Sequence, residues 1–194
     1  MEIDEKRLWN QKYREKSHTS LDPDPFLLSA YEEFLSGGPP GNALDVAGGV
    51  GRHSLWLVQR GWRATLLDIS DVGIELAEKN AASALAVSTR ELFTSRVADL
   101  NQMAGLGTEQ YELVLVFFYL QRELFPTLVS ALKPGGLLLY KTYTTDQQRF
   151  GGGPSNPKFL VKPNELLHGF PSLRVLHYHE TAQSQGVAEL VAQK

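Results

Sequence analysis

The chain has 194 residues, of which 42% are hydrophobic and 21% are charged, a composition typical of a globular protein and not of a disordered or fibrous one. The chain has 19 Lys and Arg and 22 Asp and Glu, which gives a net charge of −3. It lacks the dense cluster of basic residues that binding to nucleic acid would need. The absence of cysteine excludes disulfides, thiolate nucleophiles and cysteine-ligated metal sites.

The first residues carry charges throughout, so we expect neither a secretory signal nor a membrane segment and place the protein in the cytoplasm. The longest apolar run, 113–120, is far shorter than the roughly 20 residues of a membrane-spanning helix. Apolar residues from Ile3 to Tyr13 recur at helical spacing and predict a helix over 3–16. A second helix is predicted to begin at Pro25, so residues 1–40 form an N-terminal helical lid region.

From residue 41 onward, short apolar runs alternate with segments of helical spacing, which predicts a Rossmann-like α/β three-layer sandwich. Five parallel strands are predicted at 43–46, 64–67, 96–100, 113–118 and 137–143. Helices are predicted at 52–60, after an N-cap at Ser70, and at 122–131, with a Lys133–Gly136 turn before the fifth strand. Residues 41–143 would form the ligand-binding core of one domain spanning 1–194.

The polar segment 144–163 contains Gly151–Pro154 and is predicted to be a mobile loop, either a lid or a mobile insertion. Apolar Phe159 and Leu160 would close over a small ligand or pack on the following helix, 164–170. The terminal part, 164–194, would end in an antiparallel strand pair, 173–180 and 187–191.

Three carboxylates, Asp45, Asp68 and Asp99, fall at or near the ends of predicted parallel strands, where open α/β sheets bind ligands. The glycines at 48, 49 and 51 allow a ligand to approach the backbone, and Asp68 is placed to accept hydrogen bonds from a ribose. Ser54 stands where a dinucleotide-binding fingerprint needs its third small residue, which weakens a nicotinamide dinucleotide as the ligand.

The stretch LDVAGGVGRHSLWLVQRGWRATLLDIS resembles the cofactor loop and second strand of class I S-adenosylmethionine-dependent methyltransferases. Tyr119–Arg122, the KPGG turn and NPKFLVKPNELL look like a bacterial small-molecule branch near the tellurite-resistance and thiopurine S-methyltransferase proteins. The resemblance implies S-adenosylmethionine as cofactor and a seven-stranded, mostly parallel sheet whose last strand is antiparallel.

The resemblance also implies a cofactor site. Asp45 would support the loop and the methionine end of the cofactor, Asp68 would hold the ribose, and Asp99 with Leu100 would meet the adenine. Phe117 and Tyr119 would line the methyl side. The remaining members are Ala47, Gly48, Gly49, Gly51 and Ile69. Trp9 and Tyr13 would lie over the cofactor or serve only in packing. Asp99 could instead be a capping carboxylate. Ala47 departs from the family's usual first glycine, and Gln121 from a frequent histidine.

Methyl transfer from a sulfonium needs little acid–base chemistry when the acceptor is already nucleophilic. For an oxygen or nitrogen acceptor, Tyr119, Gln121 and His53 are the candidate bases, and none is preferred. His177 and His179 share a strand face without a third ligand, so we expect a solvated edge and no metal.

The resulting hypothesis is an S-adenosylmethionine-dependent methyltransferase with a small-molecule acceptor, and without nucleic acid or membrane partners. Two alternatives stay open. One is a non-enzymatic protein that binds S-adenosylmethionine or S-adenosylhomocysteine, and the other is a nicotinamide-dependent oxidoreductase. The acceptor and the oligomeric state do not follow from these residues.

Overall fold

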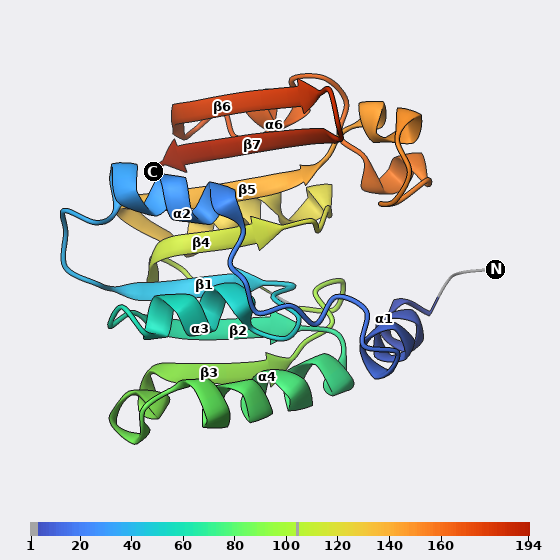
Figure 1. Ribbon diagram of the computed structural model, residues 1–194. Helices are drawn as coiled ribbons and strands as arrows, with labels where there is room; N and C mark the ends of the chain where they lie inside the picture. Colours follow the sequence, from blue (N-terminus) through green and yellow to red (C-terminus); the bar gives the residue numbers. More distant parts are fainter. Residues whose placement is uncertain (1–3, 104) are drawn as a thin grey trace. The chain divides into compact units, whose positions relative to one another are not determined.

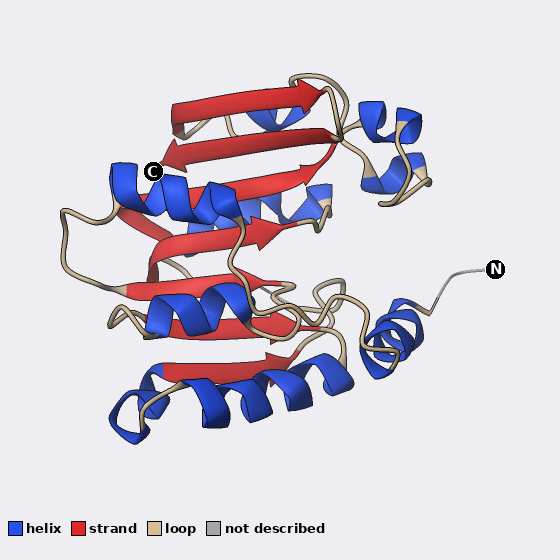
Figure 2. Cartoon of the chain, viewed as in Figure 1, coloured by secondary structure: helices blue, strands red, loops and turns tan. Residues whose placement is uncertain are grey.

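The computed structural model describes residues 4–103 and 105–194, and the chain divides into two compact units, Met1–Ala104 and Gly105–Lys194. Ile3, the first residue of the predicted N-terminal helix, lies outside the described residues. Each unit contains strands covered by helices (Figures 1 and 2).

The first unit is built on three parallel strands in the order β3-β2-β1. These are β1 (Asn42–Val46), β2 (Arg63–Asp68) and β3 (Phe93–Val97). Helix α3 (Arg52–Val58) follows the glycine loop, and α4 (Asp71–Ala84) packs against β2 and β3. A short 3-10 helix, η1 (Val87–Leu92), leads into β3.

Local signals explain where the helices of this unit begin. The side chain of Ser70 accepts the N–H of Gly73 and caps α4, as predicted. Asp24 caps α2 (Pro25–Phe34), whose first residue is proline, and Asp4 caps α1 (Glu5–Arg14). Figure 1 shows α1 near the carboxyl ends of β1 and β2.

The second unit contains four strands in the order β4-β5-β7-β6. They are β4 (Tyr111–Phe117), β5 (Leu132–Tyr143), β6 (Arg174–Ala182) and β7 (Gly186–Gln193). Strands β4 and β5 are parallel, and β7 pairs antiparallel with both β5 and β6. The helical segments are η2 (Arg122–Leu124), α5 (Phe125–Ala131), η3 (Thr145–Arg149), η4 (Pro157–Phe159) and α6 (Glu165–Gly169).

Two predicted boundaries are wrong. The third strand is Phe93–Val97 and not 96–100, because Phe93 packs against the core residues between α3, α4 and β2 and fixes the register. Residues Lys133–Gly136 belong to β5, since Gly135 and Gly136 exchange backbone hydrogen bonds with Lys194 at the chain's end. A turn prediction from proline and glycine has no means of detecting that distant partner.

The segment 144–163 carries more structure than its composition suggests. Buried Gln147 accepts the N–H of Gly186 and donates to the carbonyl of Gly152, each at 2.9 Å. Thr145 donates its N–H to Val161 at 2.9 Å. Among the described residues, no helix is both long and apolar enough to span a membrane.

Candidate functional site

The loop Ala47–Gly51 leaves β1 in a conformation that suits glycine. Ala47, Gly49 and Gly51 have positive φ angles of 55°, 60° and 85°. A Cβ on Gly48 would lie only 2.6 Å from Cγ of Asp45, so the carboxyl group of Asp45 fills the space that a side chain would need. The loop therefore presents backbone along most of its length.

Asp45 lies behind this loop and is 1% exposed. Its Oδ2 accepts the hydroxyl of Ser54 at 2.7 Å and the N–H of Ser54 at 3.2 Å. Its Oδ1 has no hydrogen-bond partner among the described residues. Burial raises the pKa of Asp45 to about 6, although the hydrogen bonds from Ser54 and the charge of Arg52 act in the opposite direction.

Asp68 ends β2 and is joined directly to the glycine loop. Its Oδ2 accepts the N–H of Gly49 at 2.8 Å, and its Oδ1 accepts the N–H of Ser70 at 2.9 Å. Burial raises the pKa of this carboxyl, and the two backbone donors lower it. A carboxylate offers about four lone-pair positions. Asp68 therefore keeps capacity for the two hydroxyl groups of a ribose.

Helix α1 brings Tyr13 onto the same loop. The phenol oxygen of Tyr13 lies 2.5 Å from the position that a Cβ on Gly49 would take, and Tyr13 is 6% exposed. Trp9 packs on Tyr13 with ring centroids 5.7 Å apart. Asn10 accepts the hydroxyl of buried Ser70 at 2.6 Å, which ties α1 to the first turn of α4.

The remaining predicted cofactor residues of the first unit follow the ends of β2 and β3. The N–H of Ala98 donates to the backbone oxygen of Asp68 at 2.7 Å, which holds the chain after β3 beside that carboxylate. Asp99 accepts the N–H of Asn101 at 3.0 Å and thus also caps a turn. Leu100 is buried and Ile69 is half-buried.

His53, a candidate base, lies in α3 and is 2% exposed. Its Nε2 accepts the backbone N–H of Asp24 at 3.3 Å. This contact supports a structural role for the imidazole, which holds the start of α2.

The other candidates belong to the second unit, at the carboxyl end of β4. Phe117 is buried, and Tyr119 donates its hydroxyl to Oε1 of Gln121 at 2.6 Å. The phenol of Tyr140, which is 1% exposed, donates to the backbone oxygen of Tyr119 at 3.0 Å. The amide of Gln121 has no basic site, so Gln121 orients Tyr119 and does not itself accept a proton.

Two residues at this end escaped the sequence analysis. Phe118 has a left-handed φ of 57°, and its ring lies 4.9 Å from that of Tyr143. Left-handed backbone at a bulky residue is strained and is often found at functional sites. Its N–H donates to the carbonyl of Lys141 at 2.7 Å, which holds this conformation.

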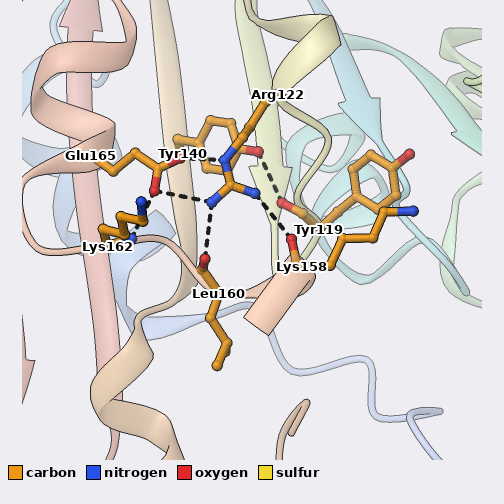
Figure 3. A network of polar contacts seen from close by, with 7 residues as sticks. All are labelled: Tyr119, Arg122, Tyr140, Lys158, Leu160, Lys162 and Glu165. Carbon is orange, nitrogen blue, oxygen red and sulfur yellow. Dashed lines mark hydrogen bonds and ion pairs between the residues drawn. The ribbon is translucent and has the colours of Figure 1, made fainter. Parts of the chain in front are cut away.

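Arg122 is the second missed residue, and it binds the segment after β5 to the loop after β4 (Figure 3). Its guanidinium pairs with both carboxylate oxygens of Glu165 and donates to the carbonyls of Lys158 and Leu160, each at 3.0 Å. Oε2 of Glu165 also accepts the N–H of Lys162 at 2.8 Å. The sequence shows only that YLQR and NPKFLVKPNELL are both present, and this clamp joins them.

Comparison with known proteins identifies a family of methyltransferase domains. Residues 43–136 match the model of a methyltransferase domain family. A comparison with curated proteins finds no match. Within residues 43–136 the chain thus has a methyltransferase domain, and this family implies S-adenosylmethionine as the co-substrate.

Solved structures resemble the chain over nearly its whole length. TehB from Haemophilus influenzae has a TM-score of 0.72 and 19% identity, covering 95% of this chain and 67% of that one. A SAM-dependent methyltransferase from Aquifex aeolicus has a TM-score of 0.69 and 14% identity, covering 99% of each chain. A structure reported for the conversion of a disulfide bond into a thioacetal group in echinomycin biosynthesis has a TM-score of 0.71 and 19% identity, covering 97% and 91%.

These likenesses confirm the predicted fold class, the seven-stranded Rossmann-like α/β fold with an antiparallel last strand. At such low identity they show the fold alone. The assignment as a methyltransferase rests on the family match together with this fold. Residues 43–136 thus match a methyltransferase domain, and its acceptor is undetermined.

Proposed function

We propose that this chain transfers the methyl group of S-adenosylmethionine to a small-molecule acceptor by in-line displacement. The observation that carries the proposal is the hydrogen bond between Asp68 and the N–H of Gly49, which joins an acidic strand end to a glycine loop. Both residues fall within the stretch that matches the methyltransferase family.

The first unit fits the cofactor. The glycine loop offers backbone where a ligand must approach closely, and Asp68 retains lone pairs for a ribose diol. We assign the cofactor site of the first unit to the residues named from the resemblance: Trp9, Tyr13, Asp45, Ala47, Gly48, Gly49, Gly51, Asp68, Ile69, Asp99 and Leu100. For Phe117 and Tyr119 of the second unit, the role at the methyl side is proposed from the resemblance alone. Tyr13 supports the assignment, because its buried phenol lies against Gly49.

Bound S-adenosylmethionine supplies an activated methyl group: the acceptor's lone pair forms the new bond to carbon while the C–S electron pair returns to sulfur. The chain's own contribution is then to place the acceptor in line and to exclude water. Tyr119, oriented by Gln121 and Tyr140, is the candidate to contact the acceptor, and a thiolate acceptor needs no base.

The test is calorimetric titration of the protein with S-adenosylhomocysteine, and separately with NAD. We expect binding of S-adenosylhomocysteine alone. Asp68→Ala should raise its Kd at least about tenfold, since each charged hydrogen bond contributes about 1.5–3 kcal/mol. Asp68→Asn tests the same contact with less change in shape. Asp22→Ala is the control, because Asp22 is an exposed carboxylate in the segment before α2.

Binding of NAD alone would support the oxidoreductase alternative and overturn the proposal. Binding of S-adenosylhomocysteine without methyl transfer to any member of a panel of thiols and chalcogen oxyanions would favour the non-enzymatic binding protein. An unchanged Kd in Asp68→Ala would refute the ribose assignment.

A further inference from the structure

Ser54 is fully buried in the first turn of α3 and directs both of its hydrogen-bond donors at one atom. Its hydroxyl donates to Oδ2 of Asp45 at 2.7 Å and its N–H to the same oxygen at 3.2 Å. Two donors on one oxygen fix the plane of a carboxylate as well as its position.

The fixed carboxylate lies directly against the glycine loop. A Cβ on Gly48 would fall 2.7 Å from Oδ2 and 2.9 Å from Oδ1, so both oxygens lie against the backbone of that residue. Oδ1 has no partner among the described residues, although it is buried. An unpaired oxygen on a buried charge is costly, and its persistence calls for a compensating role.

We propose that Ser54 is a positioning residue of the cofactor site: its two hydrogen bonds hold the Asp45 carboxylate beneath the glycine loop in the orientation that cofactor binding requires. The inference rests on the proposed function, because it assumes that this loop receives S-adenosylmethionine or S-adenosylhomocysteine. Ser54 itself contacts Asp45 and not the cofactor.

The proposal has an electrostatic consequence. The charged groups that act on Asp45 are Arg52 of α3, which favours ionisation, and Asp68 of β2, which opposes it. Tyr13 of α1 also interacts with Asp45. Burial raises the pKa of Asp45 to about 6, and the hydrogen bonds of Ser54 keep that pKa from rising further. Without Ser54, the carboxyl should therefore protonate at a higher pH.

S-adenosylhomocysteine carries an ammonium group, so a ligand at this loop should bind better when Asp45 is ionised. By linkage, its Kd should increase as the pH falls through about 6 in the wild type. In Ser54→Ala the same increase should begin at a higher pH. The Kd of Ser54→Ala should exceed the wild-type Kd at every pH, because the carboxylate loses its orientation. The difference should be several-fold near pH 7 and smaller at pH 8.5, where Asp45 is ionised in both proteins.

The experiment is calorimetric titration with S-adenosylhomocysteine from pH 5.5 to 8.5 on four proteins: wild type, Ser54→Ala, Asp45→Asn and the double variant. Asp45→Asn should bind with a Kd that depends less on pH than the wild-type Kd, because Asp68 still titrates. The loss of Ser54 should raise the Kd less in this background than in wild type, because no charge remains on residue 45. Ser54→Thr, which keeps the hydroxyl, should restore the wild-type pH profile. Ser83→Ala is the matched control, because Ser83 is exposed and its hydroxyl donates to the carbonyl of Lys79 in its own helix.

Three outcomes would overturn the inference while leaving the proposed function intact. They are a Kd in Ser54→Ala that equals the wild-type value, one that differs by the same factor at every pH, and an effect of Ser54→Ala that is equally large in the Asp45→Asn background. Failure of the wild type to bind S-adenosylhomocysteine at any pH would instead refute the proposed function, and this inference with it. The melting temperature of each variant identifies one that fails to fold. If Ser54→Ala does not fold, the inference is tested with Ser54→Thr, and a pH profile of Ser54→Thr that differs from the wild-type profile would contradict it.

Discussion

Ala47 occupies a backbone conformation that ordinarily belongs to glycine. Its φ is 55°, and left-handed backbone costs a residue with a Cβ about 1–2 kcal/mol. Glycine avoids this cost but increases the entropy of the unfolded chain. Ala47→Gly should therefore raise the free energy of unfolding by about 0.5–1 kcal/mol, measured by urea denaturation.

A matched substitution separates this effect from a general property of glycine. Ala82 is exposed in the last turn of α4, where Ala82→Gly should lower the free energy of unfolding by about 0.5–1 kcal/mol. Opposite signs at the two positions support strain at Ala47, and a loss of stability in both would contradict it.

Residues of the candidate site differ in how far the sequence reveals them. Asp68 and the glycines could be placed because a strand, a loop and a helix follow one another along the chain. Ser54 was recognised only as a mismatch to a dinucleotide fingerprint. Its bond to Asp45 depends on how the first turn of α3 packs behind β1, and no local pattern encodes that contact.

At the scale of elements, the clamp drawn in Figure 3 joins Arg122 to Glu165, which lies 43 residues later in the sequence. The guanidinium satisfies a carboxylate and two carbonyls at once, which the single ammonium of lysine does not reproduce. Arg122→Lys should therefore free the Lys158–Leu160 backbone while preserving the charge. Amide hydrogen exchange in a peptide covering 156–165 should become several-fold faster.

Lys79 provides the control for this measurement, since its exposed ion pair with Glu75 joins adjacent turns of α4. Lys79→Ala should leave exchange in 156–165 unchanged. Glu165→Gln should reproduce part of the Arg122→Lys effect, because it weakens the same pair. If amide exchange in 156–165 is unchanged in both Arg122→Lys and Glu165→Gln, contacts other than the clamp hold this segment.

The elements also show which signals act locally. The cap at Ser70 and the proline at the start of α2 were visible in the sequence because each acts within one turn of a helix. The extension of β5 through Lys133–Gly136 depends on Lys194, about 60 residues away, so the local turn signal misled. The separation of 43 residues between Arg122 and Glu165 likewise explains why the sequence did not reveal the clamp of Arg122.

At the scale of the whole molecule, the alternation of strands and helices was enough to predict the fold class, because the same hydrophobic periodicity recurs in each strand–helix pair. The partition into two compact units was not predicted. The tryptophans lie at positions 9, 56 and 62, all in the first unit, so their fluorescence reports on the unfolding of that unit.

This reporter allows the buried charge of Asp45 to be measured as a global property. The folded-state pKa is raised to about 6, above the ordinary value of 3.8, so the folded state binds more protons than the unfolded state between these values. The contribution of Asp45 to stability therefore falls as the pH rises from about 4 to about 6. Below that window the carboxyl is neutral in both states.

Asp45→Asn removes this titration while the amide oxygen can still accept the hydrogen bonds of Ser54. Its free energy of unfolding relative to wild type should therefore increase with pH, by on the order of 2–3 kcal/mol between pH 4 and 7. Asp68 titrates in both proteins, and its effect cancels in the difference. Urea denaturation followed by tryptophan fluorescence at several pH values measures it. A difference that is constant with pH would mean that Asp45 is ionised as readily in the folded protein as in the unfolded chain.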